Sequence, residues 1–238
     1  MLKNALKIFG LFILGIIGGI FGSQILWPLL VERPLFLKYR LEQTPIYVTE
    51  RKEIKIQENV ALKEAIERVE RAVILLRTKT KDGKILEGSG LILTSDGIIV
   101  TLSDLVPQGA SFSFFVEGEI VNFQILKRDK NQNLALIKVE KRNLKPVGFL
   151  NLEKLKLGER VFLVGKVLRG GKIETIVNEG IVKNFNEEKI ETNMREEQNL
   201  AGSPLFDIEG NLVGLCQIEK DGKVIALPNS KIKSFSGL

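Results

Sequence analysis

The chain has 238 residues, enough for one large domain or two small ones plus an N-terminal extension, and 44% of them are hydrophobic, which suits a globular core. Its formal net charge is +6, but basic and acidic residues are interspersed without a basic stripe that carries aromatic residues, so we expect no nucleic-acid partner. The absence of histidine excludes imidazole catalysis and a histidine-ligated metal site, and a single cysteine, Cys216, excludes an intrachain disulfide. We expect no cofactor and no metal, and we expect Cys216 to be a buried core thiol.

An uncharged apolar segment spans residues 8–30 and is long enough to cross a bilayer as a helix. Lys3 and Lys7 precede the segment, and no small-x-small cleavage site follows it. The segment therefore predicts an uncleaved anchor over residues 1–31 in preference to a signal peptide or a buried helix. We expect a single pass, with the rest of the protein on the extracytoplasmic side of the membrane.

Four glycines of this segment form two overlapping pairs with a spacing of four residues: Gly15 with Gly19, and Gly18 with Gly22. Such pairs let two membrane helices approach closely, so these glycines are candidates for self-association of the anchor, although glycine is common in membrane helices in general. Residues 32–59 mix charges, prolines and scattered apolar residues without a sustained period, which is typical of a linker.

Residues 60–238 carry the pattern of a β-rich domain. From Val60 the spacing of apolar residues predicts a helix, which gives way to a β-branched run after Ala72. Short apolar or alternating runs then follow, separated by turn signals at residues 81–84, 95–97, 117–119, 169–172, 208–211 and 220–223. Roughly a dozen strands with almost no long helical pattern predict an all-β barrel or sandwich.

Three stretches of this domain carry a recognisable set of motifs: GSGLILTSDGIIVTLSDLV at 88–106, DKNQNLALIKV at 129–139, and ETNMREEQNLAGSPLFDIEGNLVGL at 191–215. In this order they resemble the segments that carry the catalytic histidine, aspartate and serine of the HtrA branch of the trypsin-like (chymotrypsin-fold) serine proteases. On that resemblance the histidine position falls on Asp104, the aspartate position on Asn133 and the nucleophile on Ala201. The oxyanion turn falls on Asn199, Ala201 and Gly202, with Asn199 in place of a glycine.

The resemblance covers residues 60–235 and implies two six-stranded antiparallel β-barrels with a cleft between them, preceded here by the predicted transmembrane helix. It also implies trimerisation in many members of the family and often a C-terminal PDZ domain. Residue 238 directly follows the second barrel, so we expect no PDZ domain in this chain.

The residues at the three matched positions cannot perform triad hydrolysis. That reaction needs a hydroxyl nucleophile, an imidazole that transfers its proton, and a carboxylate that orients the imidazole. Alanine forms no acyl-enzyme, and the carboxylate of Asp104 is too weak a base at neutral pH. A Ser-Lys dyad built on Ser103 or Ser203 is the alternative that the sequence leaves open. We expect Asp104 and Ser103 to form a hydrogen-bonding pair within their loop.

The leading hypothesis is a membrane-anchored, catalytically inactive trypsin-like homologue. Its partners would be the membrane and either a polypeptide bound by β-augmentation or an active trypsin-like protease, in a homo- or hetero-oligomer. The alternatives are a serine endopeptidase with displaced catalytic residues and a purely structural envelope protein, because fold alone does not fix function.

Overall fold

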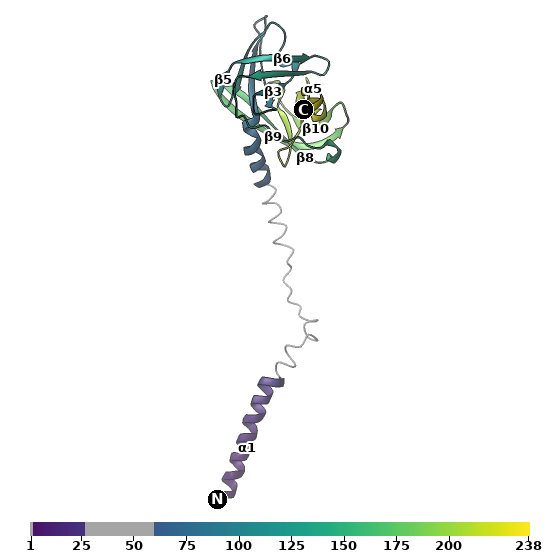
Figure 1. The fold of residues 1–238 in the computed structure, drawn as a ribbon. Coiled ribbons are helices and arrows are strands. Elements are labelled where there is room, and N and C mark those ends of the chain that lie inside the picture. The colour runs from purple at the N-terminus through teal and green to yellow at the C-terminus, as the bar shows by residue number, and fades with distance from the viewer. Residues whose placement is uncertain (1, 27–59) are drawn as a thin grey trace. The chain divides into compact units, whose positions relative to one another are not determined.

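The computed structural model describes residues 2–26 and 60–238 (Figure 1). The predicted linker at 32–59 lies outside the described residues. The chain divides into two compact units, Met1–Lys55 and Ile56–Leu238, and each is considered by itself.

The described part of the N-terminal unit is one apolar helix. Helix α1 (Leu2–Phe21) continues into a π-helical turn, η1 (Gly22–Leu26). Residues Lys7–Ile25 are long and apolar enough to cross a membrane, and none of this segment is buried by the rest of the described chain. A methyl group added to any of the four paired glycines would meet no atom of the described residues within 4 Å, so packing among those residues does not require glycine there. The predicted helix is present, whereas its insertion in a membrane and its self-association stay predictions.

The second unit starts with the predicted helix and then changes to strands. Residues 60–69 are helical, and a 3₁₀ turn, η2 (Glu70–Ala72), leads directly into strand β1 (Val73–Lys79). Ala65 and Val69 are buried against the domain, as the helical spacing of apolar residues requires.

The first half of the domain is a seven-stranded antiparallel sheet with the order β5-β4-β1-β2-β3-β7-β6. Its other strands are β2 (Ile85–Ile92), β3 (Ile98–Thr101), β4 (Ser111–Val116), β5 (Glu119–Val121), β6 (Phe123–Asp129) and β7 (Leu134–Val139). The two strands at the ends of this order, β5 and β6, are separated in the chain by Asn122 alone. They are therefore two halves of one bent strand, and the chain itself joins the two edges of the sheet.

The bend at Asn122 is fixed by bonds to the residue that follows β7. The Asn122 side-chain amide donates to the Glu140 carboxylate (3.0 Å), and the Glu140 backbone N–H donates to the Asn122 carbonyl (3.0 Å). Counted with β5 and β6 as one strand, the first half matches the predicted six-stranded barrel. The bend at Asn122 interrupts the ladder, so this half is a curled sheet whose two edge strands are joined through the chain.

The second half of the domain is a closed six-stranded barrel with the order β10-β13-β12-β11-β8-β9. Its strands are β8 (Arg160–Arg169), β9 (Lys172–Phe185), β10 (Ile190–Arg195), β11 (Pro204–Asp207), β12 (Leu212–Ile218) and β13 (Lys223–Pro228), and helix α5 (Asn229–Ser236) follows. Each of the six predicted turn signals falls at the connection of two consecutive strands, and three of them include the first or last residue of a strand. The all-β prediction is therefore confirmed, and so is the buried position of Cys216, which is 0% exposed on β12.

Candidate functional site

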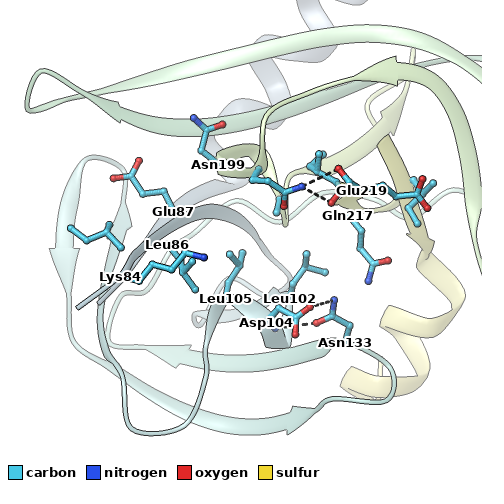
Figure 2. A pocket seen from close by; sticks show the side chains of 15 residues that line it. Lys84, Leu86, Glu87, Leu102, Asp104, Leu105, Asn133, Asn199, Gln217 and Glu219 are labelled. Carbon is cyan, nitrogen blue, oxygen red and sulfur yellow. Dashed lines mark hydrogen bonds between the residues drawn. The ribbon is translucent and has the colours of Figure 1, made fainter. Parts of the chain in front are cut away.

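A cleft of about 680 Å³ is lined by residues from both halves of the domain (Figure 2). The first half contributes residues 84–87, Leu102, Asp104, Leu105 and Asn133. The second half contributes residues 198, 199, 201, 217–219 and 225. The three matched triad positions, Asp104, Asn133 and Ala201, therefore line one cleft.

Asp104 and Asn133 hold each other at the edge of the cleft, as Figure 2 shows. Asp104 lies in the 3₁₀ turn η3 (Ser103–Leu105), and Asn133 ends the turn between β6 and β7. The Asn133 amide donates to the Asp104 carboxylate (3.0 Å), and the Asp104 backbone N–H donates to the Asn133 side-chain oxygen (3.0 Å). Asn133 has a φ of +51°, a left-handed conformation that asparagine adopts more readily than most residues. The predicted hydrogen bond pairs Asp104 with Ser103. The carboxylate of Asp104 bonds instead to the side-chain amide of Asn133, because the β6–β7 turn brings that amide to it.

The matched nucleophile loop begins with a 3₁₀ turn, η5 (Gln198–Leu200), and Ala201 follows with 8% of its surface exposed. The Ala201 backbone N–H donates to the Gln198 carbonyl (3.1 Å). An oxyanion hole requires backbone N–H groups that point at the developing charge in the cleft. The N–H at the nucleophile position is instead used inside the turn, and Asn199 lies in the turn itself.

Gly202, the next residue of this loop, packs against strands β2 and β12. Gly202 has a φ of +78°, and a Cβ at this position would overlap the Ser89 carbonyl oxygen. Its N–H donates to the Cys216 carbonyl, and the Ala201 carbonyl accepts the Ser89 N–H, both at 2.8 Å. Glycine is required here both for the backbone angle and for the close approach of strand β2.

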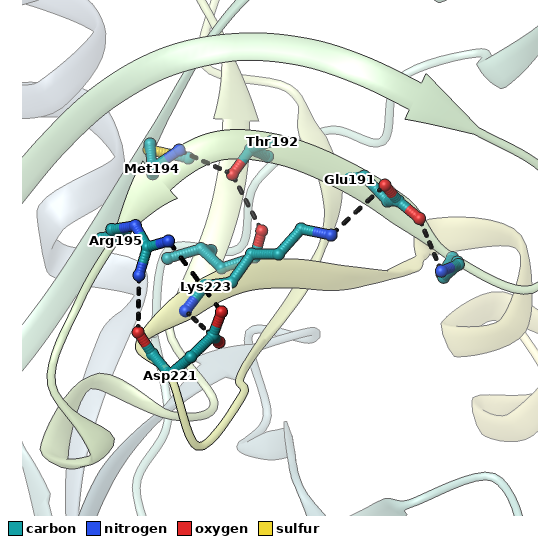
Figure 3. Close-up of polar contacts among 8 residues, drawn as sticks. Glu191, Thr192, Met194, Arg195, Asp221 and Lys223 are labelled. Atoms are coloured by element: carbon teal, nitrogen blue, oxygen red, sulfur yellow. Dashed lines mark hydrogen bonds and ion pairs between the residues drawn. The ribbon is translucent and has the colours of Figure 1, made fainter.

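The strand that leads into this loop, β10, is bonded through side chains where its ladder with β13 becomes irregular (Figure 3). The Thr192 hydroxyl donates to the Val224 carbonyl (2.9 Å), and the Arg195 guanidinium donates to the Asp221 carbonyl (2.7 Å). Lys223 pairs with Glu191 at 3.4 Å. These contacts fix the end of β10 and hence the start of the loop at residues 196–201.

Gln198 caps the strand edge that lines the cleft. Its side-chain amide donates to the carbonyls of Ile218 (2.9 Å) and Glu219 (3.0 Å), at the end of β12. Sequence patterns do not predict this contact, because the glutamine directly before the matched glycine position, Asn199, belongs to no motif.

The two serines of the alternative enzyme hypothesis do not line the cleft. Ser203 is 0% exposed, and its hydroxyl has no hydrogen-bond partner among the described residues, while Ser103 is 4% exposed. Among the described residues, Lys84 is the lysine that lines the cleft. The geometry therefore brings neither serine together with a lysine in this cleft.

Outside the cleft, burial shifts the pKa values of Cys216 and Lys166. Burial raises the pKa of the Cys216 thiol, so this cysteine is a poor nucleophile. Burial also lowers the pKa of Lys166 on β8, an effect partly offset by the carboxylates of Glu70 and Glu117. The described ranges contain no group of three histidine, cysteine, aspartate or glutamate residues arranged to hold a metal ion.

The sequence of this domain is similar to known serine proteases. The family model of the trypsin-like peptidase domain matches residues 88–215. A probable periplasmic serine endoprotease, DegP-like, from Bartonella henselae is 29% identical over 139 residues, which cover 54% of this chain and 27% of the relative. The serine protease HTRA1 of Xenopus laevis is 27% identical over 163 residues, which cover 62% of this chain and 35% of the relative. The chain thus spans about a third or less of the length of these relatives.

Solved structures share the fold. The serine endoprotease from Yersinia pestis superposes with a TM-score of 0.65 at 20% identity, covering 74% of this chain and 65% of that one. The HtrA-type protease AlgW, solved with a tripeptide, superposes with a TM-score of 0.64 at 21% identity, covering 74% of this chain and 62% of that one.

Proposed function

Since this chain belongs to the family of trypsin-like peptidase domains, we propose that it is a membrane-anchored, catalytically inactive member of that family. It acts by binding polypeptide or by assembling with an active relative. The observation that carries this proposal is the convergence of Asp104, Asn133 and Ala201 on one cleft, because the three positions matched to the triad lie together without a nucleophile or an imidazole.

The state of the nucleophile loop supports the loss of hydrolysis independently of the three side chains. Stabilisation of an oxyanion by preorganised donors is usually the largest single contribution to acyl-transfer catalysis. The N–H of Ala201 is bonded to the Gln198 carbonyl, so a serine placed at residue 201 would still lack one such donor. The buried positions of Ser103 and Ser203 argue against the displaced-serine alternative.

The apolar helix supports the anchoring part of the proposal. The segment Lys7–Ile25 has a mean hydropathy of 2.0, and its side chains are not buried. The DegP-like relative is named periplasmic, which agrees with an extracytoplasmic location for the domain. The paired glycines, which packing among the described residues does not require, would serve assembly through the anchor.

The binding part is tested with the full-length protein in detergent micelles and fluorescently labelled, unfolded casein. Binding is followed by fluorescence anisotropy, and fragments are followed by gel electrophoresis of the same samples. We expect binding without fragments. Casein fragments that appear in proportion to the protein and disappear when the buried serines are replaced would overturn the proposed inactivity.

The assembly part is tested by crosslinking in the native membrane followed by pull-down. A co-purifying trypsin-like protease supports assembly with an active relative, and other co-purifying polypeptides support binding alone. If no polypeptide co-purifies and casein does not bind, the structural envelope role replaces both.

A further inference from the structure

On its β11 side, the end of β12 beyond Cys216 pairs with no strand among the described residues. In an antiparallel ladder, alternate residues bond to one neighbour and the residues between them face the other side. Cys216 bonds toward the β11 side, through Ser203 and Gly202, whereas Glu219 bonds to Lys223 on the β13 side. Ile218, two residues beyond Cys216, therefore presents its backbone to the same side as Cys216, past the point where β11 begins.

A side chain occupies this edge in place of a strand. The Gln198 amide donates to the Ile218 carbonyl at 2.9 Å, the group to which the N–H of a bound strand would donate. Releasing Gln198 breaks its hydrogen bonds to the Ile218 and Glu219 carbonyls. A bound strand replaces the bond at Ile218 and water can replace the one at the exposed Glu219 carbonyl, so a pairing strand meets modest energetic opposition. The capped edge is a site that an extended ligand could take over by competition with Gln198.

The charge of the cleft restricts which ligand fits. Its lining includes three carboxylates, Glu87, Asp104 and Glu219, and one ammonium group, that of Lys84. Glu87 pairs with Arg77 at 3.4 Å, whereas no described cation lies within ion-pair distance of Asp104. The two hydrogen bonds with Asn133 hold the Asp104 carboxylate in one orientation, so little conformational entropy is lost when a cation binds it.

The walls around these carboxylates are apolar. Leu102 and Leu105 lie beside Asp104 in Figure 2, and Ile218 and Ile225 line the cleft from the second half of the domain. A long aliphatic side chain that ends in a positive charge matches this combination, because its stem can lie on the apolar wall while its head reaches the carboxylate.

We propose that the cleft binds an extended polypeptide segment that pairs with the Ile218 edge of β12 in place of Gln198 and presents a lysine or arginine side chain to Asp104. This inference rests on the proposed polypeptide-binding function and assigns its ligand class. Asp104 is then the residue that determines specificity, at the position matched to the catalytic histidine of the family.

The test uses the full-length protein in detergent and fluorescein-labelled heptapeptides of the sequence Gly-Val-Thr-Xaa-Val-Thr-Gly, in which Xaa is lysine, norleucine or glutamate. Norleucine keeps most of the aliphatic stem and removes the charge. We expect the lysine peptide to bind about three- to fivefold more tightly than the norleucine peptide, because Asp104 is exposed and an exposed ion pair contributes modestly. The glutamate peptide should bind most weakly.

Three variants separate charge recognition from strand pairing. Asp104→Asn keeps an oxygen that can accept from Asn133 and should remove the preference for lysine without weakening the norleucine peptide. Glu174→Gln, at an exposed carboxylate outside the cleft, is the matched control and should leave the preference unchanged. Gln198→Ala removes the competitor for the Ile218 carbonyl and should tighten all three peptides by about two- to fivefold.

The outcomes distinguish this inference from the function on which it rests. Equal binding of the lysine and norleucine peptides, or a lysine preference that survives Asp104→Asn, overturns the inference while polypeptide binding stands. Unchanged or weaker binding by Gln198→Ala overturns the pairing at Ile218. If the peptides fail to bind while unfolded casein binds, the inference alone falls, and if casein also fails, polypeptide binding falls with it.

Discussion

The hydrogen bonds at the edge of the cleft are exposed, whereas those among Ser89, Thr101, Ala201 and Gly202, here called the seam, are buried. In the seam, the Ser89 N–H bonds to the Ala201 carbonyl (2.8 Å), and the Thr101 hydroxyl bonds to the Ser89 carbonyl (2.7 Å), with both side chains fully buried. In the cleft, Asp104 and Asn133 bond to each other at the exposed edge. Buried hydrogen bonds are costly to break, whereas exposed ones are replaced by water. We therefore expect the buried bonds of the seam to contribute more to stability than the exposed bonds at the edge of the cleft.

The strongest test of the seam is Gly202→Ala. The new methyl group would overlap the Ser89 carbonyl oxygen in a backbone conformation at φ +78°, so we expect a loss of about 3 kcal/mol in the free energy of unfolding. The matched control is Gly83→Ala, because Gly83 has a φ of +83° but no atom within 4 Å of the added group. It should lose about 1–2 kcal/mol from backbone strain alone. Equal losses in a urea titration would show that the close approach does not matter.

A smaller effect is expected for Thr101→Val, which keeps the shape of the side chain and removes its donor. The Ser89 carbonyl would lose a buried partner, and we expect a loss of about 2 kcal/mol in the free energy of unfolding. The control is Thr80→Val, whose hydroxyl donates to the Lys84 carbonyl at an exposed turn and should cost about 0.5 kcal/mol. A Thr101 variant no less stable than the Thr80 variant would contradict the distinction between seam and surface.

At the edge of the cleft, Asp104→Ala removes one exposed hydrogen bond with Asn133. We expect a loss of at most about 1 kcal/mol, and almost none for Asp104→Asn, which keeps an acceptor oxygen. Chemical denaturation measures both. A loss as large as that of Thr101→Val would place part of the stability in the cleft.

The smallest expected effect concerns activity. The triple change Asp104→His, Asn133→Asp and Ala201→Ser restores the three side chains, yet we expect no casein hydrolysis above background. The N–H of residue 201 stays bonded to the Gln198 carbonyl, and Asn199 stays in the 3₁₀ turn. Adding Asn199→Gly frees the turn and should yield the first measurable hydrolysis. Robust activity of the triple variant would show that the oxyanion turn had survived.

Sequence reasoning predicted the fold, because turn signals and strand patterns are local, whereas the functional role of the matched site residues stays a prediction. The six turn signals separate strands, and the three motifs bring Asp104, Asn133 and Ala201 to one cleft. The bend at Asn122 and the cap by Gln198 were beyond prediction, since each depends on side chains that meet only after distant segments fold together. For the same reason the sequence predicts a hydrogen bond between Asp104 and its neighbour Ser103, whereas the actual partner, Asn133, comes from the β6–β7 turn.

The most direct test of the account is labelling of the full-length protein with a fluorescent fluorophosphonate, which reacts with activated serines. We expect no labelling above that of a heat-denatured sample, because no serine lines the cleft among the described residues and the chain has no histidine. Labelling of the native protein that disappears with Ser203→Ala or Ser103→Ala would contradict the account and establish a displaced active site.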